Sequence, residues 1–139
     1  MTGTCLCGAV SVTIDAKPDF IHDCNCSLCR KSGGAWGYFP PAAVTTTGGT
    51  RAYARTDKSA PAVEVHTCET CATTTHWVRT EAFKAQYGMN DLVGVNMRLF
   101  DPDALTGVEV RFPDGKGWTG EGEFGFRRTA LTLSETVRW

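Results

Sequence analysis

The seven cysteines of this chain fall into three tight clusters, and this arrangement constrains the fold more than any other feature of the sequence. When only one or two residues separate the cysteines, a short turn can aim several sulfur atoms at one point, which is typical of metal sites. The clusters are a C-x-C at Cys5 and Cys7, a C-x-C-x-x-C at Cys24, Cys26 and Cys29, and a C-x-x-C at Cys68 and Cys71.

Zinc prefers four such donors in a tetrahedron. The two clusters of two cysteines complete one set, whereas the cluster of three leaves the fourth position free. A closed site is structural, and a three-ligand site with an opening is what zinc catalysis requires. The pattern therefore predicts two zinc ions per chain, one structural and one catalytic, the second being more easily lost.

Disulfides are the alternative interpretation of the same cysteines. Seven is an odd number, so one thiol would be left over, and a disulfide within a C-x-C would close a small, strained ring. No charged and apolar leader precedes Thr2, so we expect a cytoplasmic protein, in which such clusters bind metal more often than they form disulfides.

Length and composition predict one globular domain spanning residues 1–139, with 42% apolar residues. No apolar run approaches the ~20 residues of a membrane span, so we expect no membrane association. The net charge is −1 and no basic stripe is present, which argues against nucleic-acid binding.

The residue pattern is mainly β, with many short, bent strands and little helix. Alternation places Val10, Val12 and Ile14 on one buried face of the first strand. Gly48-Gly49 predicts a hairpin-like turn between two strands. The expected strands are residues 4–14, 20–23, 35–39, 44–47, 50–55, 63–67, 73–79, 91–100 and 108–112.

Helical signals are few. Ser27 to Ser32 predicts one helical turn ended by Gly33-Gly34, and Glu81 to Tyr87 is a marginal helix. Asp101-Pro102-Asp103 is a helix-start signal. Residues 113–125 are expected to form a loop, and residues 127–139 fit either a strand or a short helix.

The four-cysteine site would join Cys7 to Cys68 across 60 residues. Closing that loop costs about 4 kcal/mol, whereas a structural zinc contributes on the order of 10–16 kcal/mol. In the other site, three thiolates make zinc a weak Lewis acid that suits an incoming thiol better than water. Carbon–sulfur chemistry is therefore expected there.

A closed second site is the competing interpretation, with a fourth ligand from the protein. The candidates are His22, which is nearest in sequence, and His66, His76 and Asp23.

The cysteine motifs resemble those of the glutathione-dependent formaldehyde-activating enzyme family, which includes centromere protein V. The resemblance covers most of residues 3–105. It rests on G-x-C-x-C-G-A-V from Gly3, C-x-C-S-x-C-R from Cys24, C-x-x-C at Cys68, and L-F-D-P-D-A-L from Leu99.

The resemblance implies a β-tent fold of short, coiled antiparallel sheets around a structural zinc. It implies that Cys5, Cys7, Cys68 and Cys71 hold the structural ion and that Cys24, Cys26 and Cys29 hold the catalytic one. The implied activity is that of a carbon–sulfur lyase acting on S-hydroxymethylglutathione or a related adduct, with glutathione as the thiol.

Two residues depart from the family pattern. Asn25 stands where histidine is common, beside the open metal, which points to a different aldehyde or thiol. Ala72 stands where glycine usually supplies a positive φ, which predicts a slightly different turn.

Arg30 is a candidate for binding a glutathione carboxylate and Trp36 for walling the pocket, although a solvated charge and core packing are the plainer interpretations. Asn96 and Arg98 are polar residues on an apolar strand that either line a pocket or face outward.

Two other functions compete with the enzyme. The chain could be a non-catalytic zinc module that binds a partner protein, or a redox sensor with reactive thiols. A homodimer is common among small domains and is a reasonable expectation.

Overall fold

The structure is a computed structural model of the chain and describes residues 1–88 and 90–139. Within these residues the strands form two sheets. The smaller has the order β1 (Thr2–Thr4), β2 (Ser11–Ile14), β5 (Val44–Thr47). The larger has the order β11 (Leu131–Thr132), β10 (Glu109–Arg111), β3 (Phe20–His22), β4 (Trp36–Phe39), β9 (Val93–Asn96), β8 (Thr74–Arg79), β7 (Val63–Cys68), β6 (Thr50–Ala54).

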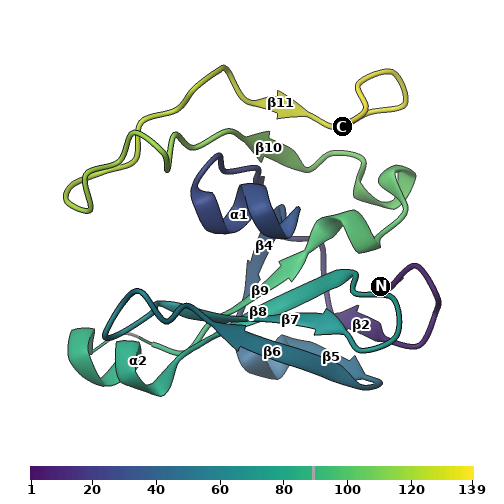
Figure 1. Cartoon of the computed structure of the whole chain (residues 1–139). Coiled ribbons are helices and arrows are strands. Elements are labelled where there is room, and N and C mark those ends of the chain that lie inside the picture. Colours follow the sequence, from purple (N-terminus) through teal and green to yellow (C-terminus); the bar gives the residue numbers. More distant parts are fainter. Residues whose placement is uncertain (89) are drawn as a thin grey trace.

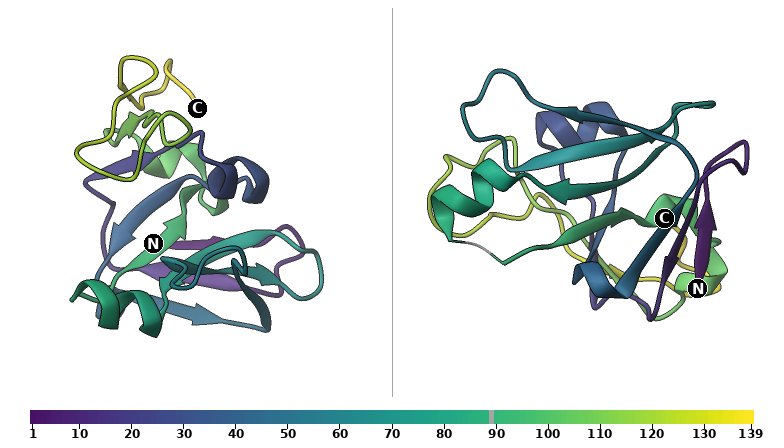
Figure 2. Two further views of the ribbon diagram at one scale, coloured as in Figure 1. Left: turned by 60° about the vertical axis from the view of Figure 1, so that its left-hand side comes forward. Right: turned by 90° about the horizontal axis from the view of Figure 1, so that it is seen from below.

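The larger sheet bends strongly near its middle, so that β10 and β11 lie in one layer and β6, β7 and β8 in another (Figure 1). The short helix α1 (Ser27–Ser32) lies between these layers, as a second viewing direction also shows (Figure 2). Neighbouring strands are antiparallel except β3 and β10, which pair in parallel. The expectation of a mainly β fold with little helix is confirmed.

The main hydrophobic core lies between the two sheets. Val10, Val12 and Ile14 are completely buried, as their alternation predicted. The final third of the chain also contributes, because Val110 and Phe112 are fully buried in or next to β10. The final third of the chain therefore supplies side chains to this core.

The helices follow their sequence signals closely. α1 begins after Cys26 and ends at Gly33, whose φ of 68° is left-handed. α2 (Glu81–Tyr87) is short, but Thr80 Oγ1 accepts from the Phe83 amide at 3.2 Å and caps its first turn. The described residues also form three 3₁₀ turns: η1 (Pro41–Ala43), η2 (Met97–Leu99) and η3 (Pro102–Leu105).

Three strand predictions were wrong in part. The expected strand 4–14 is interrupted, because only Thr2–Thr4 and Ser11–Ile14 form strands, and the Cys5 amide donates to the Val10 carbonyl at 2.9 Å across the turn between them. Gly48-Gly49 does not close a hairpin, because β5 pairs with β2 and β6 pairs with β7. Gly48 has a φ of 95°, which lets the chain cross from one sheet to the other. The expected strand 91–100 stops at Asn96, whose side chain accepts from the Arg98 amide and caps η2.

Candidate metal centres

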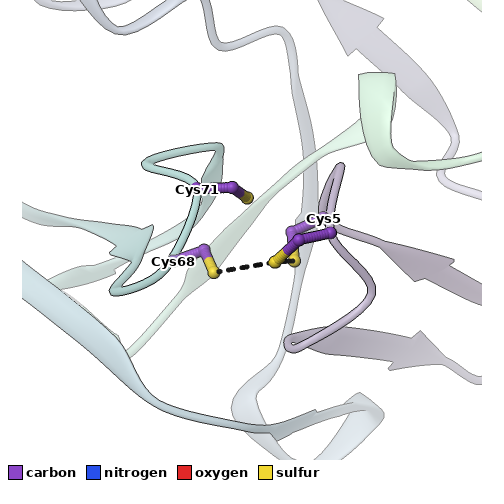
Figure 3. Close-up of side chains that lie close together, drawn as sticks. Cys5, Cys68 and Cys71 are labelled. Atoms are coloured by element: carbon purple, nitrogen blue, oxygen red, sulfur yellow. Dashed lines mark hydrogen bonds between the residues drawn. The ribbon is translucent and has the colours of Figure 1, made fainter.

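The first group of sulfur atoms joins two distant parts of the chain. Cys5 comes from the segment after β1, whereas Cys68 and Cys71 come from the turn after β7, and the three sulfurs point toward one another (Figure 3). With Cys7 they form a set in which all sulfur atoms lie within 4.8 Å of one another.

The spacing of these sulfurs suits a tetrahedral ion. A Zn–S bond of about 2.3 Å places neighbouring sulfurs of a tetrahedron roughly 3.8 Å apart. The Cys7 sulfur lies 3.6 Å from that of Cys5 and 3.8 Å from that of Cys68. The donor set could therefore hold zinc as four thiolates, two from each part of the chain.

The turn that carries Cys68 and Cys71 is tightly bonded. The Ala72 amide donates to the Cys68 carbonyl at 2.9 Å, and the Cys68 amide donates to the Thr73 carbonyl at 2.9 Å. Ala72 has a φ of 59°, in the left-handed region. The expectation that Ala72 changes the turn is therefore wrong, because alanine adopts the conformation that glycine would supply, at a steric cost.

Thiolate formation at this turn is favoured locally. The Thr73 hydroxyl lies 3.1 Å from Cys71 Sγ and, with the Thr73 amide, lowers the pKa of the Cys71 thiol to about 5. A thiol with a low pKa is a better metal ligand because it binds as the thiolate.

The second group of sulfurs surrounds the start of α1. The sulfur atoms of Cys24, Cys26 and Cys29 all lie within 4.8 Å of one another, and those of Cys26 and Cys29 are 3.3 Å apart. Cys26 caps the helix, since its sulfur accepts from the Cys29 amide at 3.4 Å. Hydrogen bonds with Cys24 and Cys29 strongly lower the pKa of Cys26, whereas those with Cys24 and Cys26 raise the pKa of Cys29.

Two aromatic residues lie behind this second group. Trp36 is only 2% exposed and donates from Nε1 to Cys29 Sγ at 3.2 Å. Tyr38 is mostly buried, and burial followed by the nearby thiolates raises its pKa, so the phenol stays neutral. Trp36 therefore contacts the centre as a buried hydrogen-bond donor.

The candidate fourth ligands are engaged elsewhere. His22 Nδ1 lies 3.0 Å from the Tyr38 hydroxyl oxygen. The rings of His66 and His76 stack on each other, with their centres 4.4 Å apart. Asp23 binds Arg98 and Arg127. Among the histidine, cysteine, aspartate and glutamate side chains of residues 1–88 and 90–139, only the three cysteines form this group.

A polar loop from the final third of the chain covers one side of the second group. Asn25 Nδ2 donates to Asp114 Oδ1 at 2.7 Å, and Asn25 Oδ1 accepts from the Lys116 amide at 2.8 Å. Gly115 packs so closely that a Cβ there would lie 2.5 Å from Cys24 Sγ. We name residues 113–117 the covering loop. Asn25 therefore positions this loop, so its departure from the family pattern affects what surrounds the sulfurs.

Asp23, directly before the first of these cysteines, anchors the end of the chain. Its carboxylate accepts from Arg98 Nη2, Arg127 Nη2 and Trp139 Nε1, each at 3.0 Å. The Arg98 guanidinium also lies over the Trp139 ring, 4.7 Å from its centre. Arg98 thus holds the C-terminal segment. Asn96 is buried, and its Nδ2 donates to the Thr74 carbonyl at 2.8 Å. Neither residue lines the cavity described next.

A cavity of about 620 Å³ opens between α1 and the strands that lead into the first sulfur group. Arg30, which the sequence suggested as a ligand-binding residue, is exposed on α1 and is absent from the lining, whereas its neighbour Lys31 is present. The lining residues are Ser27, Leu28, Lys31, Ser32, Tyr53, Arg55, Asp57, Val65, Thr67, Ala72 and Thr74. Sequence spacing could not indicate this cavity because three separate segments build it.

Comparison with known protein families shows to which of them this chain belongs. The sequence profile of the glutathione-dependent formaldehyde-activating enzyme family matches residues 1–107. The chain belongs to this family. Both sulfur groups, Cys5 to Cys71, lie inside the matched region, and the covering loop and the C-terminal segment lie beyond it.

A solved structure has a similar fold. A crystal structure of a Rhodobacter sphaeroides protein, solved as a structural genomics target, aligns with a TM-score of 0.57 at 24% identity and covers 73% of this chain and 88% of that one. None of the curated proteins matches the chain. No helix among the described residues combines the length and apolar character needed to cross a membrane.

Proposed function

We propose that this protein is a zinc-dependent carbon–sulfur lyase acting on a thiol–aldehyde adduct such as S-hydroxymethylglutathione. The observation that carries the proposal is the separation of the seven sulfurs into a set of four and a set of three. Four thiolates complete a structural tetrahedron, and three leave a position for a substrate sulfur. Family membership supports glutathione and formaldehyde as the reactants.

The proposed reaction breaks one carbon–sulfur bond. The bonding electron pair leaves with the glutathione sulfur, the adduct hydroxyl loses its proton as the carbon–oxygen double bond forms, and the sulfur takes up a proton. The products are glutathione and formaldehyde, and the reverse direction forms the adduct from them. Zinc held by the three thiolates would supply affinity for a soft sulfur donor and favour its anionic form.

The protein residues around the three sulfurs have separate tasks in this proposal. Cys24, Cys26 and Cys29 hold the ion, and the Trp36 Nε1 donor reduces the charge on the Cys29 sulfur. The Gly115 backbone packs against Cys24 Sγ and restricts access to the sulfur from that side. A substrate therefore approaches from a side that the covering loop leaves free.

The remaining expectations are part of the same proposal. We assign one zinc ion to each sulfur group, and a cytoplasmic location and a homodimer remain predictions. A contact of Arg30 with a glutathione carboxylate also stays a prediction, and it requires a ligand that reaches the exposed side of α1.

Exchange NMR with ¹³C-formaldehyde and glutathione tests the activity. The zinc-loaded protein should accelerate exchange between free formaldehyde and S-hydroxymethylglutathione, and Cys26→Ser should remove that acceleration while the domain stays folded. Exchange at the uncatalysed rate, with both ions bound, would favour the non-catalytic zinc module instead.

A further inference from the structure

The cavity of about 620 Å³ is lined by residues that adjoin a cysteine of each sulfur group in sequence, and it has a charged rim. Ser27 and Leu28, from one wall, directly follow Cys26, and Ala72, from the opposite wall, directly follows Cys71. The two walls are joined by the Thr74 hydroxyl, which donates to the Ser32 carbonyl at 2.7 Å. A volume of this size is in the range of roughly 300–1,000 Å³ that is typical of small-molecule sites.

One pair of charges on the rim is held rigidly. Arg55 donates from Nε and Nη2 to the two carboxylate oxygens of Asp57, at 2.9 and 2.5 Å. Arg55 Nη1 also donates to Ser27 Oγ at 3.3 Å, which ties the pair to the loop that carries the three cysteines. The Asp57 side chain is 62% exposed, so its carboxylate can accept a further donor from a ligand.

The third charge on the rim is the Lys31 ammonium. In the part of the chain that the structure describes, no carboxylate lies within 4.0 Å of it. The lining therefore contains two cations and one anion, giving a net charge of +1. This arrangement is complementary to a ligand that carries more carboxylates than ammonium groups.

We propose that this cavity binds the charged, peptide-like part of the thiol whose sulfur reaches the three-cysteine centre. Lys31 binds a carboxylate of that thiol, and the Arg55–Asp57 pair binds a zwitterionic amino-acid end, with Asp57 accepting from its ammonium. The ligand class is a small thiol peptide with one ammonium and at least two carboxylates. This inference rests on the proposed function, and it assigns carboxylate binding to Lys31 in place of Arg30.

A thioether probe separates this cavity from the metal. S-Methylglutathione keeps both charged ends but has no thiol to ionise, so its binding reports on the cavity. We expect calorimetric binding to the zinc-loaded protein and about tenfold weaker binding to both Lys31→Gln and Asp57→Asn, which corresponds to about 1.4 kcal/mol each. Arg51→Gln is the control: like Lys31→Gln it removes one positive charge, but Arg51 lies on β6 outside the cavity lining, so the affinity should stay unchanged.

Several results would overturn the inference. Among them are no binding of S-methylglutathione to the wild-type protein, equal affinity for the wild type and Lys31→Gln, and tighter binding to Asp57→Asn. Weaker binding to Arg30→Gln alone would place the carboxylate on the other side of α1.

A second probe distinguishes this inference from the proposed function. 2-Mercaptoethanol is an uncharged thiol, and its binding to the cobalt-loaded protein is visible in the absorption spectrum. If it changes the spectrum but S-methylglutathione does not bind, the cavity inference fails and the proposed function stands. If neither glutathione nor 2-mercaptoethanol changes the spectrum, the proposed function fails and the cavity inference fails with it.

Discussion

Asn25 and Asp114 are 89 positions apart in the sequence, yet Asn25 Nδ2 donates to Asp114 Oδ1 at 2.7 Å. This bond connects the three-cysteine loop to a part of the chain that the family profile does not match. It places the Gly115 backbone against Cys24 Sγ. The surroundings of the three-cysteine group therefore include a segment that lies outside the region matched by the family profile.

The first prediction concerns the close approach of Gly115. In Gly115→Ala the new Cβ would meet Cys24 Sγ at 2.5 Å and Cys26 Cβ at 2.9 Å. Either the covering loop or one of these cysteine side chains must therefore shift. We expect faster release of one zinc ion to a chromogenic chelator. Gly125→Ala is the matched control, because its Cβ would have no atom within 4 Å. Equal release rates for the two variants would contradict the contact.

The second prediction concerns the strained turn at Ala72. Ala72→Gly should raise the free energy of unfolding by about 1 kcal/mol, because a left-handed φ costs a non-glycine residue roughly 1–2 kcal/mol. Gly88→Ala is the opposite change at a φ of 58° in open space, and it should lower stability by a similar amount. Thermal unfolding of the zinc-loaded variants measures both, and a destabilised Ala72→Gly would show that the turn is not strained.

The third prediction contrasts the two sulfur groups. Cys71→Ser removes one of four ligands that join Cys5 to β7 across the chain, so we expect it to unfold or aggregate. Cys26→Ser should lose one zinc ion and keep its circular dichroism spectrum and cooperative unfolding. A Cys71→Ser protein with unchanged melting temperature would refute the structural assignment of the first group.

The fourth prediction concerns pH. His76 is 7% exposed, and burial, followed by repulsion from His66, lowers its pKa from 6.5 to about 4. Between these values the unfolded chain binds more protons than the folded one, so stability falls as the pH drops through this window. The loss reaches about 3 kcal/mol below pH 4 and vanishes above pH 7.

Denaturant unfolding of the wild type and His76→Gln at several pH values tests this. Acid release of zinc affects both proteins, so it cancels when the free energy of unfolding of His76→Gln is subtracted from that of the wild type. This difference should grow as the pH rises from 4 to 6.5. A difference that is constant over this range would show that His76 keeps an ordinary pKa in the folded state.

Local signals in the sequence predicted local structure well. The bounds of α1 follow from Cys26 as the cap and Gly33 as a left-handed end, and the buried face of β2 follows from the alternation of Val10, Val12 and Ile14. The two sulfur groups follow from cysteine spacing, because a short turn leaves few directions for its side chains. In each case the controlling interaction lies within a few residues.

Features that depend on distant contacts could not be predicted. Gly48-Gly49 has the composition of a hairpin turn, but pairing of β5 with β2 was decided by the packed sheet. The covering loop depends on one amide–carboxylate bond between polar residues that look like ordinary surface positions. Lys31, Arg55 and Asp57 likewise line one cavity only because the fold brings α1 next to the segment that follows β6.

Native mass spectrometry of the zinc-loaded protein, before and after addition of glutathione, tests the central claim most directly. One closed centre and one thiol-accepting centre predict two zinc ions per chain and one retained glutathione, with one zinc and no retained glutathione for Cys26→Ser. Two zinc ions without retained glutathione in the wild-type protein would contradict the claim that the three-cysteine centre accepts this thiol.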